Sequence, residues 1–255
     1  MEADFSRRFG GIGRLYGDAV LARFRRAHLC VVGIGGVGSW AAEALARSGI
    51  GAITLVDLDN IAESNANRQI HALETTFGQA KVTAMADRIR AINPACRVTE
   101  VEDFITPENA GGLLDGGFDG VIDAIDQVRA KVAMTAWCRQ AGLPIIVAGG
   151  AGGKADPTAI RIDDLSRTIQ DPLLARVRSS LRKSHGFPRD PKRKFGISAV
   201  YSTEAITLRA AGENCAVAAT GGLNCAGFGS SMCVTASFGL FAASAILRGL
   251  MEAPR

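Results

Sequence analysis

The chain has 255 residues, of which 47% are hydrophobic and 21% are charged, and its net charge is +4. This composition excludes a disordered or fibrous chain, and a chain of this length buries roughly three quarters of its unfolded surface, so it needs no disulfide bonds. The six cysteines contain no Cys-x-x-Cys pair, which excludes the usual zinc and dithiol redox motifs. The opening MEADFSRRFGG is polar and charged, so we expect no signal peptide and a reduced, cytoplasmic protein.

The first clear motif is a strand, a glycine-rich turn and a helix between residues 29 and 49. Residues 29–32 form an apolar run typical of a buried strand, and helical spacing begins at residue 39. The residues proposed for phosphate binding are Gly33, Gly35, Gly36, Gly38 and Ser39. Such a turn lets an anion approach the backbone at a helix N-terminus. Because nicotinamide, flavin and adenine nucleotides all carry phosphates, the turn alone leaves the ligand open.

Strands and helices alternate along the first 150 residues. We predict strands at 53–56, 97–101, 120–125 and 143–148, and helices at 18–26, 81–92 and 130–141. This alternation is typical of a Rossmann-like, doubly wound and mainly parallel α/β sheet, in which ligands bind beyond the carboxyl ends of the strands. The glycine turn and the carboxylates that follow two of the strands should therefore face one cleft.

The pattern changes after residue 153, where shorter, less regular strands are predicted at 159–162 and 200–208, with an antiparallel arrangement as one option. We divide one domain, 1–255, into a core at 8–150 and an irregular α/β extension at 151–255 that contains a basic segment, 173–195. The candidate RNA-binding residues in that segment are Arg176, Arg178, Arg182, Lys183, Arg189, Lys192, Arg193 and Lys194. A solvated mobile loop is the alternative. Phe187 and Phe195 would either stack on a base or anchor the segment to the core.

Residues 232–247 form an apolar stretch without a charged side chain, and Arg248 follows it. A membrane span needs about 20 apolar residues, and this stretch is shorter and diluted by small polar residues. We therefore expect a helix that is buried against the sheet. Peripheral membrane association is the alternative.

The residues after the strand at 53–56 favour ATP over a redox cofactor. Asp57 follows the strand 19 positions after Gly38, where a carboxylate can bind ribose hydroxyls. Arg68 carries a guanidinium suited to phosphate oxygens, and Lys81 adds a second cation at the start of a helix. Taken alone, each cation could equally be a solvated surface residue or part of a weak surface ion pair.

Asp123 and Asp126 follow a later strand of the same predicted sheet. One or both could hold Mg²⁺, which takes one or two carboxylates together with phosphate oxygens. The alternative for Asp123 is that it caps the next element. Two cations and a metal at one cleft suit the negative charge that builds on a triphosphate during reaction, and they exceed what hydride transfer requires.

These motifs resemble the adenylating domain of the ubiquitin-activating (E1-like) superfamily, with which ThiF, MoeB and HesA are grouped. That superfamily has a GxGGxGS loop, D-x-D, S-N-x-x-R-Q, a downstream Lys and D-x-x-D, and residues 8–150 carry all of them. The resemblance implies attack of a carboxylate on the α-phosphate of ATP, which gives an acyl-adenylate and pyrophosphate. The residues it implies for ATP are Asp57, Asp59, Asn65, Arg68, Gln69, Lys81 and Asp123, with Asp126 for Mg²⁺.

The resemblance also implies a homodimer in which an N-terminal arginine reaches the partner's γ-phosphate. The usual R-Y-x-R-Q entry is replaced here by Arg8-Phe9-Gly10-Gly11-Ile12. Because Gly11 occupies the position of the second arginine, Arg14 and Arg8 are the candidates for this role.

Sulfur-carrier activators of this superfamily usually hold zinc through two Cys-x-x-Cys pairs, which this chain lacks, so we expect no zinc. Residues 149–158, 164–173 and 224–231, with the basic segment, resemble the tRNA threonylcarbamoyladenosine dehydratases nearly end to end. That family implies ATP-dependent cyclisation of N6-threonylcarbamoyladenosine at position 37 of tRNA. The resemblance also suggests a cysteine desulfurase or sulfur-acceptor system as a partner and a monovalent cation as a ligand. Cys225 is then a candidate for a thioester or persulfide step, or simply a buried thiol.

Three other functions compete with this hypothesis. An activator of a small sulfur-carrier protein would use a protein carboxylate, and zinc would support it. A nicotinamide-binding redox domain would bind NAD and release no pyrophosphate. A scaffold for ATP and a desulfurase would keep its cellular role when Asp126 is replaced by alanine.

Overall fold

The computed structural model describes residues 4–206 and 229–252. Its centre is one seven-stranded sheet with the strand order β3-β2-β1-β4-β5-β7-β6. The strands are β1 (His28–Val32), β2 (Ala52–Val56), β3 (Arg97–Val101), β4 (Gly120–Asp123), β5 (Ile145–Ala148), β6 (Ile160–Asp164) and β7 (Ser198–Ser202). Neighbours pair in parallel except β6, which is antiparallel to β7. The predicted doubly wound, mainly parallel α/β fold is therefore confirmed.

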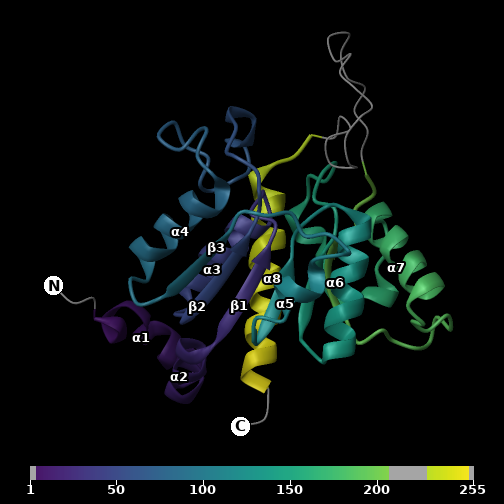
Figure 1. The fold of residues 1–255 in the computed structure, drawn as a ribbon, viewed down its shortest axis with the longest axis horizontal. Helices are drawn as coiled ribbons and strands as arrows, with labels where there is room; N and C mark the ends of the chain where they lie inside the picture. Colours follow the sequence, from purple (N-terminus) through teal and green to yellow (C-terminus); the bar gives the residue numbers. More distant parts are fainter. Residues whose placement is uncertain (1–3, 207–228, 253–255) are drawn as a thin grey trace.

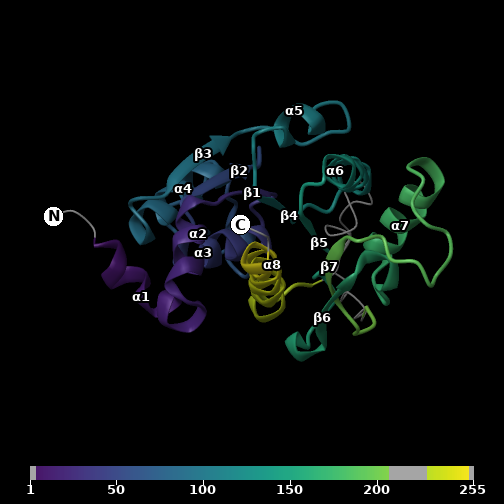
Figure 2. The ribbon, with the colours of Figure 1, turned by 90° about the horizontal axis from the view of Figure 1, so that it is seen from below.

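The central strands are continuous apolar runs because helices cover both faces of the sheet. Successive side chains of β1 enter opposite cores: Leu29 and Val31 pack on one face, Cys30 and Val32 on the other. The helices of the first face are α2 (Asp18–Arg26), α3 (Gly38–Arg47), α4 (Lys81–Ile92) and α8 (Met232–Glu252), with α1 (Phe5–Tyr16) beside α2. Those of the second face are α5 (Ala110–Leu114), α6 (Val128–Ala141) and α7 (Pro172–Ser184). Figure 2 shows the sheet between these two layers.

The register brings three strands to an end at the same level. Val32 of β1 is paired with Val56 of β2 and with Asp123 of β4. The loops that follow these strands therefore emerge side by side at the carboxyl edge, the upper edge of the sheet in Figure 1. The helices α1 and α2 lie at the opposite edge.

The basic segment is helical over its first half, which differs from the mobile loop considered as an alternative. The carboxylate of Asp171 accepts a hydrogen bond from the Leu174 amide, and Pro172 occupies the first turn of α7. The helix buries an apolar stripe on the α6 side of the core: Leu173, Leu174, Val177 and Leu181. In the extension, β6 and β7 continue the same sheet, and β7 ends at Ser202, earlier than the predicted 208.

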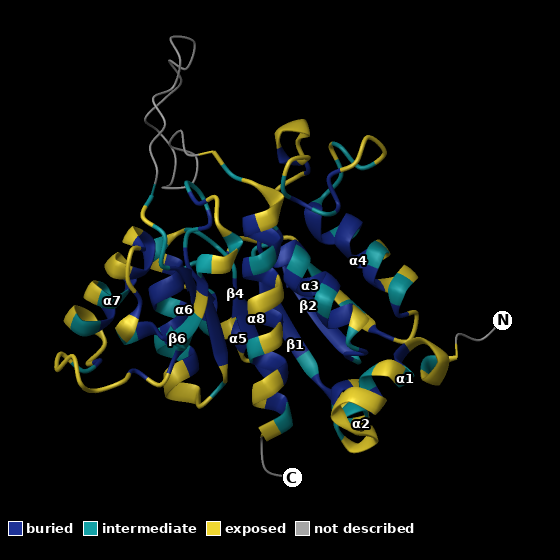
Figure 3. Ribbon diagram, turned by 180° about the vertical axis from the view of Figure 1, so that it is seen from behind, coloured by how far each residue is buried: buried dark blue, intermediate teal, exposed yellow. Residues whose placement is uncertain are grey.

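The helix α8 is long and apolar enough to cross a membrane by length and composition, but 56% of its most apolar window is buried inside the protein. Figure 3 shows its buried face against the sheet and an exposed stripe on the other side. Gly239 allows a close approach to α3, because a Cβ there would lie 2.4 Å from the Val37 carbonyl oxygen. This packing agrees with the buried helix that we expected for residues 232–247.

Candidate nucleotide-binding site

The glycine turn between β1 and α3 has a shape that two of its glycines impose. Gly33 has a φ of 87°, in the left-handed region, and a Cβ on Gly38 would lie 1.8 Å from the Gly33 carbonyl oxygen. The turn therefore closes tightly on itself before α3 begins. The backbone of Gly35 and Gly36 is left at the carboxyl edge, at the N-terminus of α3, where an anion would be favoured.

Asp57 connects this turn to the strand next to it. One oxygen of its carboxylate accepts a hydrogen bond from the Ile34 amide at 2.6 Å, and the other accepts one from the Asp59 amide at 2.9 Å. The second oxygen also lies 3.8 Å from Nζ of Lys81. A single carboxylate thus fixes the glycine turn relative to the D-x-D loop.

Lys81 is buried, and its ammonium group lies 2.6 Å from Oδ2 of Asp59. Its backbone amide also donates to the Asp59 carbonyl at 3.0 Å. The side chain of Asp59 is 55% exposed, so this partner can be exchanged for another anion at little cost. The structure brings Asp57, Asp59 and Lys81 together, as the sequence predicted for one cleft.

Arg68 is held against the glycine turn by contacts with neutral groups, and no carboxylate of the described residues forms an ion pair with it. Its guanidinium donates to the Ser64 carbonyl at 2.8 Å and to Oδ1 of Asn67 at 2.9 Å, and both partners are neutral. The indole of Trp40 donates to the Arg68 carbonyl at 2.9 Å. A Cβ on Gly36 would lie 3.2 Å from Cγ of Arg68, so the side chain lies directly on the turn.

Asn65 and Gln69 have structural contacts in the same loop. The side chain of Asn65 accepts a hydrogen bond from the Ala62 amide at 3.1 Å, which shapes the short 3₁₀ turn Glu63–Asn65. Gln69 is buried, and its amide nitrogen lies 3.9 Å from the position of a Cβ on Gly35. Its Oε1 has no hydrogen-bond partner within the part of the chain that the structure describes.

The hydroxyls of Ser39 and Thr235, near the turn, are also buried and have no hydrogen-bond partner among residues 4–206 and 229–252. Thr235 comes from the first turn of α8, and its Cβ would lie 3.4 Å from a Cβ on Gly36. Buried polar groups normally have partners, so these atoms together with Oε1 of Gln69 mark a place for a polar ligand. Sequence reasoning missed Thr235 because nothing local in the apolar tail links it to the glycine turn.

The structure does not bring Asp123 to the cleft as a nucleotide contact. Its carboxylate is fully buried beneath the start of α6 and lies 2.7 Å from Nζ of Lys131, which is fully buried as well. Burial raises the pKa of Asp123, and the charge of Lys131 partly offsets this. The alternative of a structural role at the next element describes it better. Sequence reasoning missed Lys131, whose position within the predicted helix gave no sign of this pairing.

Asp126 is half-buried at the carboxyl edge just before α6. Within residues 4–206 and 229–252, no hydrogen bond or ion pair engages its carboxylate, and no three His, Cys, Asp or Glu side chains are grouped for metal binding. An unengaged carboxylate at this edge fits Mg²⁺ only together with phosphate oxygens, which is how Mg²⁺ is usually held beside nucleotides.

The remaining candidates lie away from this edge. Arg14 is exposed on α1, at the opposite edge of the sheet from the glycine turn of its own chain. Arg8 donates to the Ile92 carbonyl at 2.8 Å and so caps α4. Cys225 lies outside the described residues.

The cations of the basic segment fall into two groups. The guanidinium of Arg178 donates to the hydroxyl of Thr168, and Arg182 donates to the Pro188 carbonyl at 3.2 Å and lies over the Phe195 ring. These two are half-buried and engaged within the fold, which does not support their assignment to RNA. The exposed members are Arg176, Lys183, Arg189, Lys192, Arg193 and Lys194.

Phe187 and Phe195 are buried and stack edge to face, with their ring centroids 4.9 Å apart. Asp164 fixes the same segment, because its carboxylate accepts hydrogen bonds from the amides of Phe195 and Gly196 at 2.9 and 2.7 Å. Of the two roles considered for the phenylalanines, anchoring to the core is the one the structure has.

Comparison with known proteins places this geometry in a family. The chain is 52% identical over 250 residues to the tRNA threonylcarbamoyladenosine dehydratase of Haemophilus influenzae, with 98% of this chain and 95% of that protein covered. It is also 52% identical to the dehydratase of Escherichia coli K12, with 96% and 93% covered. The solved structure of the E. coli dehydratase, TcdA, in complex with ATP matches with a TM-score of 0.88 at 50% identity, over 96% of this chain and 94% of that one. Because the model of the ThiF family matches residues 9–250, this chain belongs to the ThiF family.

Proposed function

We propose that this protein is an ATP-dependent enzyme that dehydrates N6-threonylcarbamoyladenosine at position 37 of tRNA, through adenylation of the threonyl carboxylate. The observation that carries the proposal is the assembly of Arg68, Lys81 and the glycine turn at one edge of the sheet. The two relatives that are 52% identical to this chain are dehydratases, and the E. coli dehydratase has been solved with ATP. Hydride transfer by a redox enzyme would not require this concentration of cations.

In this mechanism the chain's residues bind the nucleotide and stabilise charge. The amides of the glycine turn and the N-terminus of α3 bind phosphate, and Asp57 and Asp59 bind the ribose. Asp59 then releases Lys81, which together with Arg68 faces the triphosphate, and Thr235, Ser39 and Gln69 supply further polar contacts. The hydrogen-bonded position of Arg68 on the turn is the one from which it would meet phosphate oxygens.

The first step forms a bond between a carboxylate oxygen and the α-phosphorus and breaks the bond to the β-phosphate oxygen, so pyrophosphate leaves. Arg68 and Lys81 stabilise the negative charge that the leaving group gains. Asp126 would hold Mg²⁺ with phosphate oxygens, and the ion would neutralise further phosphate charge.

The second step closes a ring and needs no nucleophile from the protein. A nitrogen of the carbamoyl group attacks the activated carbonyl, the nitrogen loses its proton, and AMP leaves with the electron pair of the broken bond. Such an intramolecular attack has an effective molarity of about 10⁵ M or more in favourable cases. A thioester or persulfide on Cys225 is therefore not required, although the chain carries that thiol.

We place this enzyme in the cytoplasm as a homodimer that binds tRNA through the exposed cations of the basic segment. An arginine of α1, Arg14, would then reach the partner subunit, which agrees with its exposure away from its own glycine turn. A desulfurase or sulfur-acceptor partner and a monovalent cation rest on the family resemblance alone.

The decisive experiment is mass spectrometry of nucleosides from threonylcarbamoyl-modified tRNA after incubation with the protein, ATP and Mg²⁺. We expect this nucleoside to lose the mass of one water molecule only when ATP is present. An unchanged nucleoside, with ATP still bound by the protein, would contradict the proposal. Release of pyrophosphate on addition of a carrier protein ending in Gly-Gly would then identify an activator of sulfur carriers.

A further inference from the structure

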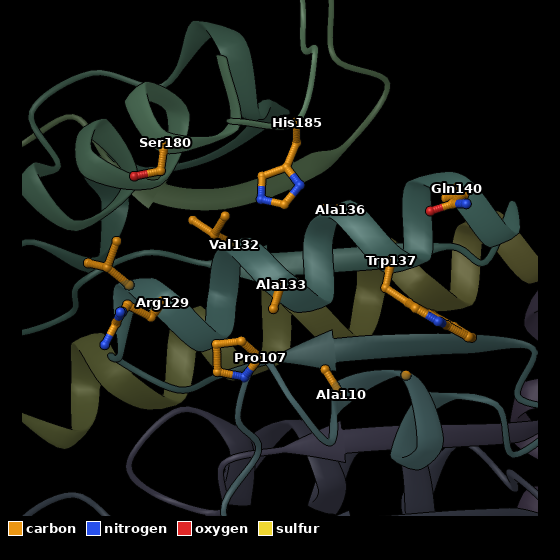
Figure 4. Close-up of a pocket in the computed structure, with 12 residues that line it drawn as sticks. Pro107, Ala110, Arg129, Val132, Ala133, Ala136, Trp137, Gln140, Ser180 and His185 are labelled. Carbon is orange, nitrogen blue, oxygen red and sulfur yellow. The ribbon is translucent and has the colours of Figure 1, made fainter. Parts of the chain in front are cut away.

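A groove of about 440 Å³ lies outside the nucleotide-binding site, between α5, α6 and α7. Its floor is one face of α6, where residues recur at helical spacing from Arg129 to Gln140. The small side chains of Ala133 and Ala136 leave this part of the floor low, and α5 and α7 form the walls. Figure 4 shows Pro107 and Ala110 below α6 and Ser180 and His185 above it.

Apolar side chains predominate in the lining of the groove, as they do in ligand sites. The polar side chains of the lining are those of Arg129, Gln140, Ser180 and His185. Trp137 is half-exposed in the groove. Its indole nitrogen lies close to Gly111 of α5, because a Cβ built on that glycine would be 3.2 Å away. The nitrogen side of the ring therefore packs near α5, and the ring as a whole stays partly exposed.

The first residues of α6 connect the groove to Asp126 along the chain. Val128 and Arg129, which line its first part, follow Asp126 by two and three residues in the sequence. From there the groove follows α6, which is roughly 20 Å long at 1.5 Å per residue. A polymer that binds along α6 would therefore pass from the edge that carries Asp126 to the groove.

Charge indicates what kind of polymer this is. His185, at the wall, directly follows α7, and the exposed cations of the basic segment lie on and after this helix with a single acid, Asp190, among them. Arg129 adds a cation at the end nearer Asp126, where the exposed carboxylate of Glu108, next to the lining residue Pro107, partly offsets its charge. A polyanion with flat apolar groups complements this surface, because aromatic and apolar side chains bind unstacked bases while Lys and Arg bind the phosphates.

We infer that the groove between α5, α6 and α7 binds an unstacked base of the same tRNA strand that carries the reacting adenosine, with Trp137 as its aromatic contact. The inference rests on the proposed function and adds a second contact to it. It makes substrate recognition depend on a nucleotide outside the reacting one, and on a surface that takes no part in ATP binding.

Fluorine NMR can test this directly, because the chain has two tryptophans, one at each site. Trp40 donates to the Arg68 carbonyl beside the glycine turn, and Trp137 lies in the groove. In protein labelled with 5-fluorotryptophan, ATP should shift the Trp40 resonance. An anticodon stem-loop RNA should shift or broaden the Trp137 resonance, which Trp137→Phe identifies by its loss.

A matched pair of variants tests the same point through affinity. Ala133→Phe fills the groove and should weaken stem-loop RNA binding at least fivefold while ATP affinity stays unchanged. Ala91→Phe places the same ring on an exposed site of α4 and should leave RNA affinity as it was. Thermal unfolding of both variants checks that each retains its fold.

Three other outcomes of these experiments would contradict the inference. If RNA binds but the Trp137 resonance stays in place and Ala133→Phe binds normally, the groove is not the base site. If the Trp137 resonance moves with protein concentration without RNA, a second copy of the chain occupies the groove. If no RNA binds while ATP still shifts Trp40, the proposed function fails and the groove assignment fails with it.

Discussion

The charged residues around the glycine turn differ in how well their neighbours compensate them. Lys81 has two carboxylates within 4 Å, whereas the contacts of Arg68 are neutral oxygens. Among the described residues, no carboxylate therefore compensates the charge that Arg68 brings to the turn, and Lys81 becomes available when the exposed side chain of Asp59 gives way. We expect an incoming triphosphate to contact both cations.

Replacing Arg68 or Asp126 with alanine should lower turnover at least about tenfold, which corresponds to about 1.4 kcal/mol of transition-state stabilisation. Both side chains lie at the edge of the sheet rather than in the core, so the fold should remain intact. Rates of ATP-dependent dehydration measure the expected loss of turnover, and thermal unfolding curves check that the fold is intact. Near-normal rates in both variants would remove these residues from the site.

Thr235→Val should weaken ATP binding about three- to tenfold, because one hydrogen bond contributes roughly 0.5–1.5 kcal/mol. Isothermal titration with a non-hydrolysable ATP analogue measures the affinity, and Thr235→Ser should restore it. Thr135→Val is the control, since Thr135 on α6 is also buried with an unpartnered hydroxyl. Equal losses in both valine variants would mean that the effect is one of packing.

His71 should make the protein less stable in mild acid. Burial lowers its pKa to about 4, and the charges of Lys81 and Arg88 add to this. In the unfolded chain the His71 imidazole has a pKa near 6.5, so below that pH it binds a proton that the folded protein does not bind. The free energy of unfolding therefore falls by up to about 3 kcal/mol between pH 6.5 and 4.

Urea unfolding at pH 7.5 and 4.5 measures this loss. His71→Leu should lose less stability between the two pH values than the unmodified protein does. His185→Leu changes an exposed histidine and should leave the acid loss in place. An identical pH dependence in all three proteins would mean that His71 is not its source.

At the scale of elements, the buried pair of Asp123 and Lys131 connects β4 to α6. Lys131→Met should cost about 3–5 kcal/mol of stability, because it leaves a buried carboxylate without its partner. The double variant Asp123→Leu with Lys131→Met should recover most of that loss. Chemical unfolding of the three proteins gives the comparison, and a double variant as unstable as the single one would show that packing dominates.

The elements of the core could be predicted because their signals are local. The strand β1 is apolar after His28, β2 is apolar apart from Thr54, and the tight glycine turn between β1 and α3 follows from the glycines at positions 33 and 38. The helix α7 was missed because its charges obscure an apolar stripe at helical spacing. Lys131 and Thr235 could not be assigned from sequence, since their contacts exist only once distant segments have packed together.

At the scale of the molecule, one edge of the sheet carries the candidate chemistry, and the basic segment extends along the second layer of helices. The segment is attached through Asp164 and the two phenylalanines, so its exposed cations have a defined place relative to the groove. A tRNA that contacts these cations can reach the carboxyl edge without leaving the surface of α6 and α7.

Lys192→Glu with Arg193→Glu should weaken tRNA binding and lower the slope of log affinity against log salt by about 1–2 units, since each lost phosphate contact removes a little under one. Filter binding over a range of salt concentrations measures the slope. Arg26→Glu with Arg97→Glu reverses two exposed charges elsewhere and should change it little. An unchanged slope in the first pair would place the RNA on another face.

The contact between α8 and the glycine turn has a consequence for biosynthesis. Gly36 and Thr235 lie next to each other although about two hundred residues separate them in the sequence. A ribosome that adds roughly 5–20 residues per second needs roughly 10–40 s to cover that interval, and during this time α8 does not cover the turn. A nascent chain that stalls before α8 carries the complete glycine motif without the Thr235 side of the site, so we expect ATP binding to arise only after α8 has been made.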